Sequence, residues 1–176
     1  MPLKLVHQTP VQKREAYAHV NRIVSPQNFK VLVVDDVELN RTVVRLLLER
    51  IGAKVSEAKD GQEAVDMYAA EPFNVVIMDI IMPVMDGVKA MNRIRTMEKG
   101  NDVPIIALTA SGFDDKRQQL LDAGFTDYIL KPFRESELLG SIAAHTDVVF
   151  EVKKEPKKAP EEVEQSEMSQ ILESVE

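Results

Sequence analysis

Five polar residues of the sequence directly follow short apolar runs, and their types are suited to binding a metal ion or a phosphate. They are Asp35, Asp36, Asp79, Thr109 and Lys131. Each apolar run is typical of a buried strand, and the carboxyl ends of parallel strands meet at one edge of a sheet. We therefore expect three carboxylates, one hydroxyl group and one ammonium group to lie together at that edge.

Three converging carboxylates require cations. At an effective dielectric of 20, two carboxylates about 5 Å apart repel each other by about 3 kcal/mol. Lys131 supplies a single positive charge. A few carboxylates together with water and a phosphate are the usual ligands of Mg²⁺ in proteins. The sequence therefore predicts a Mg²⁺ site at this edge.

The same groups are arranged to receive a phosphoryl group. Its equatorial oxygens need several positive or hydrogen-bonding contacts, and an aspartate can act as the nucleophile that forms an aspartyl phosphate. Each residue also has a plainer interpretation, because an aspartate at a strand end often caps the next helix. We assign only that capping role to Asp86, whereas the joint occurrence of the other five on successive strand ends favours a site.

Strand and helix signals alternate between Lys30 and His145. Helix 38–51, for example, has apolar residues at helical spacing (Leu39, Val43, Leu46, Leu47 and Ile51) and ends at Gly52. Parallel strands need crossover connections, so the pattern indicates an α/β domain of three layers, a doubly wound five-stranded parallel sheet with helices on both faces. We expect strands at 31–34, 53–58, 75–78, 104–108 and 126–130, and helices at 38–51, 62–70, 87–98, 114–123 and 135–144.

The sequence divides into three segments. We expect a partly ordered N-terminal extension at 1–29, one domain at 30–147 and a charged, flexible tail at 148–176. Within the tail, Met168 and Leu172 belong to an apolar stripe that fits either a short terminal helix or a frayed end.

Composition excludes several classes of protein. A net charge of −7 argues against a nucleic-acid-binding module, and the absence of cysteine excludes disulfides and thiolate metal sites. No apolar run approaches the roughly 20 residues that span a bilayer, and the N-terminus lacks a signal-peptide core. We therefore expect a cytoplasmic protein with no direct membrane contact.

Four motifs carry a resemblance to a known family. The stretches VLVVDD, VIMDIIMPVMDG, PIIALTA and DYILKPF, in this order and spacing, resemble the receiver domain of two-component response regulators. The resemblance covers about residues 30–145 and implies a (βα)5 flavodoxin-like fold with strand order 2-1-3-4-5.

The resemblance also implies roles for individual residues. Asp79 matches the phosphoacceptor, and the metal ligands would be Asp35, Asp36, Asp79 and the backbone carbonyl of Ile81. Phosphate would be bound by Thr109, the backbone amide of Ala110 and Lys131. Thr109 and Tyr128 match the pair that changes position on phosphorylation, and the Lys131–Pro132 peptide bond is expected to be cis.

A receiver domain takes its phosphoryl group from a phosphohistidine. The implied partner is the dimerisation domain of a histidine kinase or a histidine phosphotransfer domain, with homodimer formation on phosphorylation left open. On this interpretation the chain is a phosphoacceptor that promotes its own phosphorylation, and it is not an enzyme with turnover. The positions that flank the phosphate are Ile81 and Ser111, which are poorly suited to orient water, so we predict a long-lived phosphoryl group.

The flanking sequences resemble receiver segments of hybrid histidine kinases, so a fragment of such a kinase and a stand-alone receiver both stay open. Two other classes compete. A phosphatase of the haloacid dehalogenase type needs Asp-x-Asp after its first strand, whereas this sequence has Asp35–Asp36–Val37. A pseudo-receiver would bind partners without phosphorylation, which the complete set of site residues disfavours.

Overall fold

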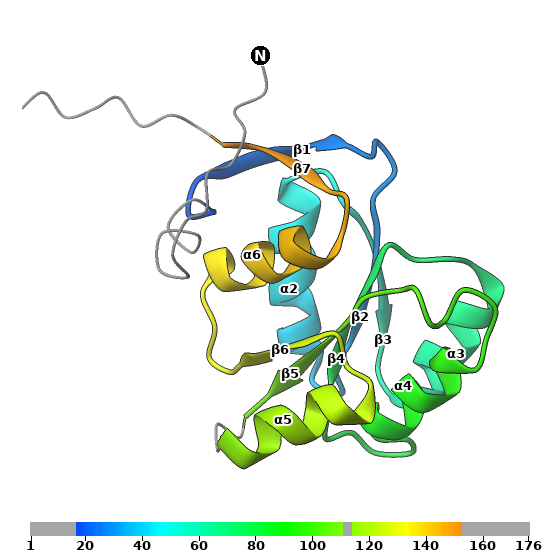
Figure 1. Ribbon diagram of the computed structural model, residues 1–176. Helices are drawn as coiled ribbons and strands as arrows, with labels where there is room; N and C mark the ends of the chain where they lie inside the picture. The colour runs from blue at the N-terminus through cyan, green and yellow to red at the C-terminus, as the bar shows by residue number, and fades with distance from the viewer. Residues whose placement is uncertain (1–16, 111–113, 153–176) are drawn as a thin grey trace, which may run out of the picture.

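The structure is a computed structural model that describes residues 17–110 and 114–152 (Figure 1). A five-stranded sheet forms its centre, built from β2 (Lys30–Val34), β3 (Lys54–Ala58), β4 (Val75–Asp79), β5 (Ile105–Thr109) and β6 (Asp127–Leu130). The strand order is β3-β2-β4-β5-β6 and all four pairs are parallel. Since β2 is the first strand of this sheet, this is the order 2-1-3-4-5, and the predicted fold is confirmed.

Five helices cover the two faces of the sheet. They are α2 (Glu38–Arg50), α3 (Gly61–Ala70), α4 (Gly87–Arg95), α5 (Asp114–Ala123) and α6 (Glu135–His145). Helices α3, α4 and α5 pack on one face, and α2 and α6 pack on the other (Figure 1). Along β2, Leu32 and Val34 belong to the first core cluster, while Val31 and Val33 belong to the second. Burial on both faces explains why the strands are continuous apolar runs.

Helix α2 buries only part of the apolar set that its spacing suggests. Val44 and Leu48 are buried against the sheet, whereas Leu39, Val43 and Leu46 are exposed. The helix was predicted within one residue of its observed end, but its apolar residues extend around more of its surface than the sheet can cover. An apolar face on α2 therefore remains open to solvent.

A second, two-stranded sheet was not predicted. Strand β1 (Val20–Ser25) pairs antiparallel with β7 (Val149–Val152), and we call this pair the β1–β7 ribbon. The two strands lie in the segments predicted as the partly ordered extension and as the tail, so paired structure continues past both predicted boundaries. The ribbon forms because Val20 and Val148 are buried in the second core cluster.

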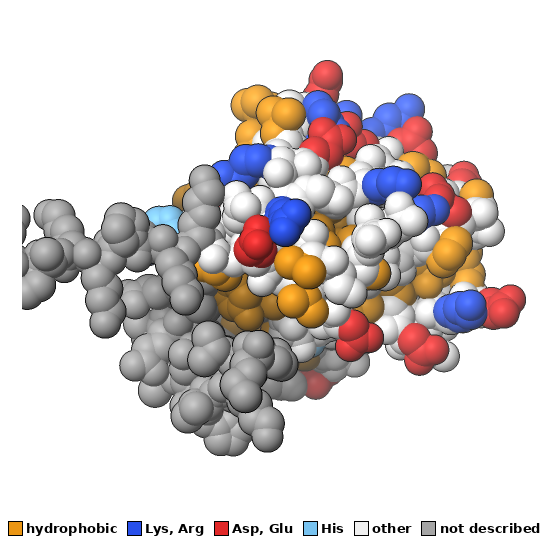
Figure 2. All heavy atoms as spheres, turned by 90° about the horizontal axis from the view of Figure 1, so that it is seen from above, with side chains coloured by type: hydrophobic (Ala, Val, Ile, Leu, Met, Phe, Trp, Pro, Cys, Tyr) orange, Lys and Arg blue, Asp and Glu red, His pale blue; other side chains and the backbone are white. Residues whose placement is uncertain are grey.

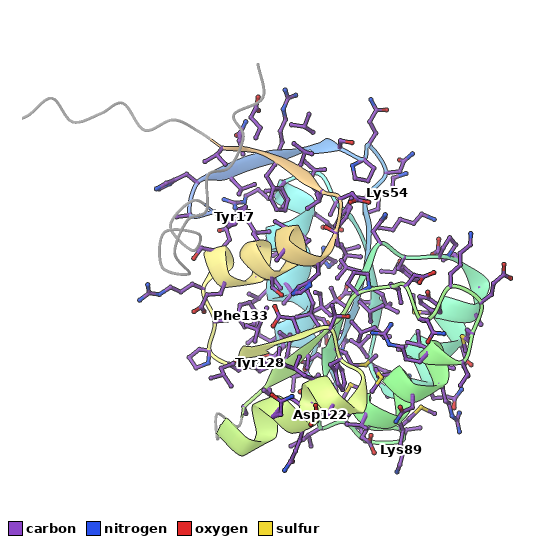
Figure 3. All side chains as sticks on the ribbon, in the orientation of Figure 1. Tyr17, Lys54, Lys89, Asp122, Tyr128 and Phe133 are labelled. Carbon is purple, nitrogen blue, oxygen red and sulfur yellow. The ribbon has the colours of Figure 1, made fainter. Side chains whose placement is uncertain are left out.

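Further contacts attach the ribbon to the domain. The amide of Ile23 donates to the carbonyl of Ile51 at 2.7 Å, which joins β1 to the end of α2. The rings of Tyr17 and Phe150 meet edge to face with centroids 6.0 Å apart, and Figure 3 shows Tyr17 between the ribbon and α6. The view from above the ribbon shows apolar side chains interspersed with charged ones (Figure 2).

Within residues 17–110 and 114–152, no helix is both long enough and apolar enough to cross a membrane. The tail beyond Val152, with its predicted stripe at Met168 and Leu172, lies outside the described residues, as does Ser111.

Candidate functional site

The ends of four strands bring the predicted residues together. Asp35 and Asp36 directly follow β2, Asp79 is the last residue of β4, Thr109 is the last residue of β5, and Lys131 directly follows β6. The parallel register pairs Val34 with Met78, Asp79 with Leu108 and Thr109 with Leu130, so these ends lie level with one another.

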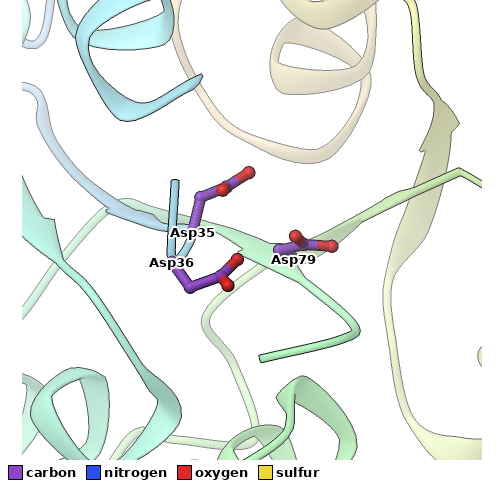
Figure 4. A group of neighbouring side chains, drawn as sticks. All are labelled: Asp35, Asp36 and Asp79. Atoms are coloured by element: carbon purple, nitrogen blue, oxygen red, sulfur yellow. The ribbon is translucent and has the colours of Figure 1, made fainter. Parts of the chain in front are cut away.

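Asp35, Asp36 and Asp79 form an acidic cluster. Each carboxylate contributes an oxygen to a set whose members all lie within 4.8 Å of one another. Figure 4 shows the three side chains at neighbouring strand ends. Asp35 is 1% exposed, Asp36 is exposed and Asp79 is partly buried. Oxygen ligands at this spacing, with more negative than positive charge, suit Mg²⁺ and agree with the predicted metal site.

Lys131 bridges two members of the acidic cluster. Its Nζ donates to Asp35 Oδ2 at 2.6 Å and to Asp79 Oδ2 at 3.1 Å. Burial by itself lowers the pKa of Lys131, but the hydrogen bond from Lys131 to Asp35 and the charges of Asp79 and Asp35 outweigh it, so the pKa lies above its usual value. Lys131 therefore keeps its positive charge beside the candidate nucleophile.

The carboxylate of Asp79 is costly to ionise. Burial is the largest cause and raises the pKa of Asp79 above its usual value of 3.8, against the opposing effect of Lys131. The charge of Asp35 raises it further, whereas the Ile80 amide, which donates to Asp79 Oδ1 at 2.7 Å, lowers it. A cation bound to this carboxylate would therefore relieve an existing electrostatic penalty.

The loop between β4 and α4 packs closely against the backbone of Asp79. The amide of Gly87 donates to the carbonyl of Ile80 at 2.9 Å. A Cβ atom at Gly87 would lie 2.1 Å from the backbone oxygen of Asp79, so only glycine permits this close approach. Asp86 caps α4, as predicted, by accepting a hydrogen bond from the amide of Lys89, and this bond lowers the pKa of Asp86.

Thr109 and Tyr128 lie on the same face of neighbouring strands. Tyr128 is opposite Ala107, two residues before Thr109, and its ring packs against the first core cluster. A hollow of about 250 Å³ lies beside Thr109, with Ile80 and Leu120 among its lining residues. The geometry is compatible with a coupled movement of Thr109 and Tyr128, which stays a prediction.

The remaining predicted residues occupy the positions around the acidic cluster. Ile81 follows β4 in the loop with its side chain 78% exposed, and Ala110 follows β5. The Lys131–Pro132 peptide bond is cis. The metal and phosphate contacts assigned to the Ile81 carbonyl and the Ala110 amide stay predictions.

Sequence reasoning missed a residue whose side chain contacts a carboxylate of the acidic cluster. The Asn40 side chain, in the first turn of α2, donates from Nδ2 to both carboxylate oxygens of Asp35, each at 3.1 Å. The available signal was its position five residues after Asp35, since side chains in a first helical turn point back toward the preceding segment.

Comparisons with known proteins find related sequences over most of the domain. A family model described as the response regulator receiver domain matches residues 31–143. The sensor histidine kinase GacS of Pseudomonas protegens is 37% identical over 131 residues, which are 73% of this chain and 14% of that kinase. The chemotaxis protein CheY of Halobacterium salinarum is 37% identical over 114 residues, which are 65% of this chain and 93% of that protein.

Solved structures show the same fold. The receiver domain of the sensor histidine kinase PA1611 from Pseudomonas aeruginosa, with a magnesium ion coordinated in its active-site cleft, has 36% identity and a TM-score of 0.63. That match covers 67% of this chain and 97% of that domain. The Vibrio cholerae chemotaxis protein CheY4 has 33% identity and a TM-score of 0.64, over 67% of this chain and 98% of that chain.

Proposed function

The chain belongs to the family of response regulator receiver domains, and from this premise we propose that Asp79 accepts a phosphoryl group from a phosphohistidine in a two-component phosphorelay. The observation that carries the proposal is the position of the Asp79 carboxylate. It lies within the acidic cluster, in contact with Lys131, at the edge of the sheet where ligands of such folds bind.

The proposed step is an in-line displacement. A carboxylate oxygen of Asp79 attacks the phosphorus atom, the P–O bond forms as the P–N bond to the donor imidazole breaks, and the electron pair of that bond leaves with the imidazole nitrogen. Lys131, which contacts Asp79 Oδ2 at 3.1 Å, neutralises negative charge on the phosphoryl oxygens.

Mg²⁺ would be held by Asp36, Asp79, Asp35 and the backbone carbonyl of Ile81. When bound, it would supply positive charge to the phosphoryl oxygens. Support for this ligand set comes from the 4.8 Å grouping of the three carboxylates and from the magnesium ion that the PA1611 receiver domain holds in its cleft.

Thr109 and Tyr128 would convert the new charge into a change of surface. The Thr109 hydroxyl and the Ala110 amide would donate hydrogen bonds to phosphoryl oxygens. Tyr128 would then move inward into the space that Thr109 leaves. The hollow that Thr109 lines leaves room for the Thr109 side chain to turn. The surface formed by β5, α5 and β6 would then bind a different partner, or a second copy of the chain.

The phosphodonor would dock beside the site on exposed apolar side chains. Leu39, Val43 and Leu46 lie on α2, and Ile81 and Val84 lie in the β4–α4 loop. Both elements begin at the edge that carries the acidic cluster, and exposed apolar groups of this kind mark protein interaction surfaces. A helix carrying the phosphohistidine, from a kinase dimerisation domain or a phosphotransfer domain, fits this surface.

Intact mass after incubation with acetyl phosphate and Mg²⁺ tests the acceptor function. We expect one phosphoryl group on the wild type and none on Asp79→Asn or in EDTA. An unmodified wild type, with a phosphohistidine donor also failing, would leave a pseudo-receiver. Steady turnover of a simple phosphate ester would instead favour the phosphatase.

The docking surface is tested separately. Leu39→Ser should slow transfer from a phosphotransfer domain at least several-fold while leaving the rate with acetyl phosphate unchanged. Leu121→Ser, at an exposed leucine on α5, is the matched control. Equal transfer rates for the Leu39 and Leu121 variants would place the donor elsewhere.

A further inference from the structure

The side chain of Asn40 reaches from α2 to a carboxylate of the acidic cluster. Its Nδ2 atom lies 3.1 Å from both oxygens of the Asp35 carboxylate. Because Nδ2 is equally far from both oxygens, one N–H group of the amide can be shared between them. The Asp35 side chain is almost completely buried, which leaves the protein to supply the partners for its charge.

The contacts of Asp35 account for all its acceptor positions. Oδ1 accepts from the Val37 amide at 2.9 Å and from Asn40, and Oδ2 accepts from Asn40 and from Lys131 Nζ at 2.6 Å. An ionised carboxylate has about four lone-pair directions, and each has a partner in this structure. A bound cation would take the direction on Oδ2 that Lys131 now occupies, when the ammonium group shifts. The Asp35 backbone is fixed as well, because Arg41 Nη1 donates to its carbonyl oxygen at 2.7 Å.

Lys131 and Asn40 differ in how freely they can move away from Asp35. Lys131 also contacts Asp79, at 3.1 Å, so a phosphoryl group on Asp79 would compete with Asp35 for its ammonium group. Asn40 is held in the first turn of α2, and its described bonds to the acidic cluster go to Asp35. The amide can therefore stay on Asp35 while the ammonium group shifts.

We infer that Asn40 is a positioning residue for the metal and phosphoryl site, acting through Asp35. It holds the buried carboxylate in a fixed orientation beside Asp36 and Asp79, so the cluster is arranged before a cation arrives. This role deepens the proposed function and rests on it. Partners that orient metal-binding carboxylates typically change metal affinity by about 10- to 100-fold when removed.

The test is the affinity for Mg²⁺ alone, measured by calorimetry without a phosphodonor. Asn40→Leu keeps the shape of the side chain and removes both donors, and we expect its Mg²⁺ dissociation constant to rise by about 10-fold or more. Asn40→Gln keeps the amide and should recover part of the affinity. Asn92→Leu, at an exposed asparagine of α4, is the matched control and should bind as the wild type does.

Circular dichroism at the same temperature establishes that each variant is folded, and a second readout separates positioning from a purely structural role. In phosphorylation by acetyl phosphate, Asn40→Leu should need more Mg²⁺ for half-maximal rate and reach nearly the wild-type rate at saturation. Equal Mg²⁺ affinity for Asn40→Leu and the wild type would overturn the inference alone. A wild type that binds no Mg²⁺ would overturn the proposed metal site together with it.

Discussion

Asp79 carries its charge at a partly buried position, and this charge reduces the stability of the metal-free fold. Because burial raises the pKa of Asp79 above 3.8, the folded protein holds the proton more tightly than the unfolded chain. The contribution of protonated Asp79 to the free energy of unfolding is therefore present at low pH, and it is lost as the pH rises through the raised pKa.

Asp79→Asn should consequently unfold at higher urea concentration than the wild type at pH 7 in EDTA. The difference should shrink as the pH is lowered toward about 4, because protonation relieves the wild type and leaves the asparagine unchanged. Urea titrations across this range measure it. A constant difference at all pH values would show that the ionisation of Asp79 is not the cause.

Saturating Mg²⁺ should make the wild type more stable to urea than Asp79→Asn, which reverses the order expected in EDTA. A cation present at 100 times its dissociation constant stabilises the folded state by about 2.7 kcal/mol. The wild type should gain this amount, whereas Asp79→Asn, which lacks one charged ligand, should gain much less. The same urea titrations with Mg²⁺ in place of EDTA supply the comparison.

Ile81 bears on the lifetime of the phosphoryl group. Its side chain is 78% exposed beside the end of β4 and offers no polar atom to orient an attacking water. We predict a phosphoryl group that persists well beyond seconds in Mg²⁺ buffer, and faster decay in Ile81→Asn. Following the phosphorylated mass over time after removal of acetyl phosphate would decide this, since loss within seconds in the wild type contradicts the prediction.

Most site residues could be predicted because their positions follow from local rules. A polar residue after a buried strand must lie at the sheet edge, and this rule located Asp35, Asp79 and Lys131. Asn40 could not be found in this way. A single asparagine inside a helix is ordinarily a surface residue, and its position five residues after Asp35 becomes informative only when the path from β2 into α2 is known.

At the scale of the elements, the β4–α4 connection holds the acceptor strand in place. The first residue of α4, Gly87, packs so closely on the Asp79 carbonyl that an added Cβ atom would lie 2.1 Å from it. The backbone of one of the two elements must therefore move if a side chain is introduced there.

Gly87→Ala should lower the free energy of unfolding by about 1–3 kcal/mol, the usual cost of overpacking. It should also slow phosphorylation by acetyl phosphate, because the end of β4 carries the nucleophile. Gly140→Ala on α6 is the control, since its nearest neighbour is the movable ring of Tyr17 at 3.3 Å. Equal urea stability for the two variants would show that α4 tolerates the displacement.

In helix α2, apolar spacing predicts the helix but does not predict which of its faces is buried. The spacing predicted the helix, but Val44 and Leu48 face the sheet while Leu39 and Leu46 face solvent. A helix with apolar residues on more than one face does not indicate which face packs. The choice depends on how the preceding strand and loop orient the helix, which is not encoded in the helix alone.

At the scale of the whole molecule, the β1–β7 ribbon extends the domain beyond the residues of the family model. The model matches residues 31–143, whereas the ribbon joins Val20 to Val152. Within the described part of the chain, the first residue of β1 and the last residue of β7 are thus paired, at the end of the central sheet opposite the carboxyl ends of its strands (Figure 1).

The ribbon should contribute to stability without taking part in the chemistry. Val20 on β1 is 5% exposed and Val24 on the same strand is 50% exposed. Val20→Ala should lower the free energy of unfolding by about 1.5 kcal/mol, since it removes two buried methyl-sized groups. Val24→Ala should change it by less than about 0.5 kcal/mol.

Both valine variants should be phosphorylated at the wild-type rate at temperatures where they are folded. Urea unfolding and acetyl phosphate labelling are the two measurements. Equal destabilisation by the two substitutions would mean that the inner face of β1 is not packed as described.

The parallel sheet of five strands could be predicted because each βα unit is local and parallel strands require crossovers. The strand order followed from the resemblance to receiver domains. The ribbon could not be predicted. Its two short strands are joined by pairing across the entire domain, and Glu151 lies next to a highly charged stretch that is typical of a linker. Nothing in either strand alone indicates its partner.

Reductive trapping would identify the side chain that holds the phosphoryl group. Borohydride reduces an acyl phosphate to an alcohol, so an aspartyl phosphate becomes homoserine, which peptide mapping locates. After incubation with acetyl phosphate and Mg²⁺, we predict homoserine at position 79 alone, and none when EDTA is present. Homoserine at Asp35 or Asp36, or a phosphorylated protein with no reduced residue at all, would contradict the assignment of Asp79 as the acceptor.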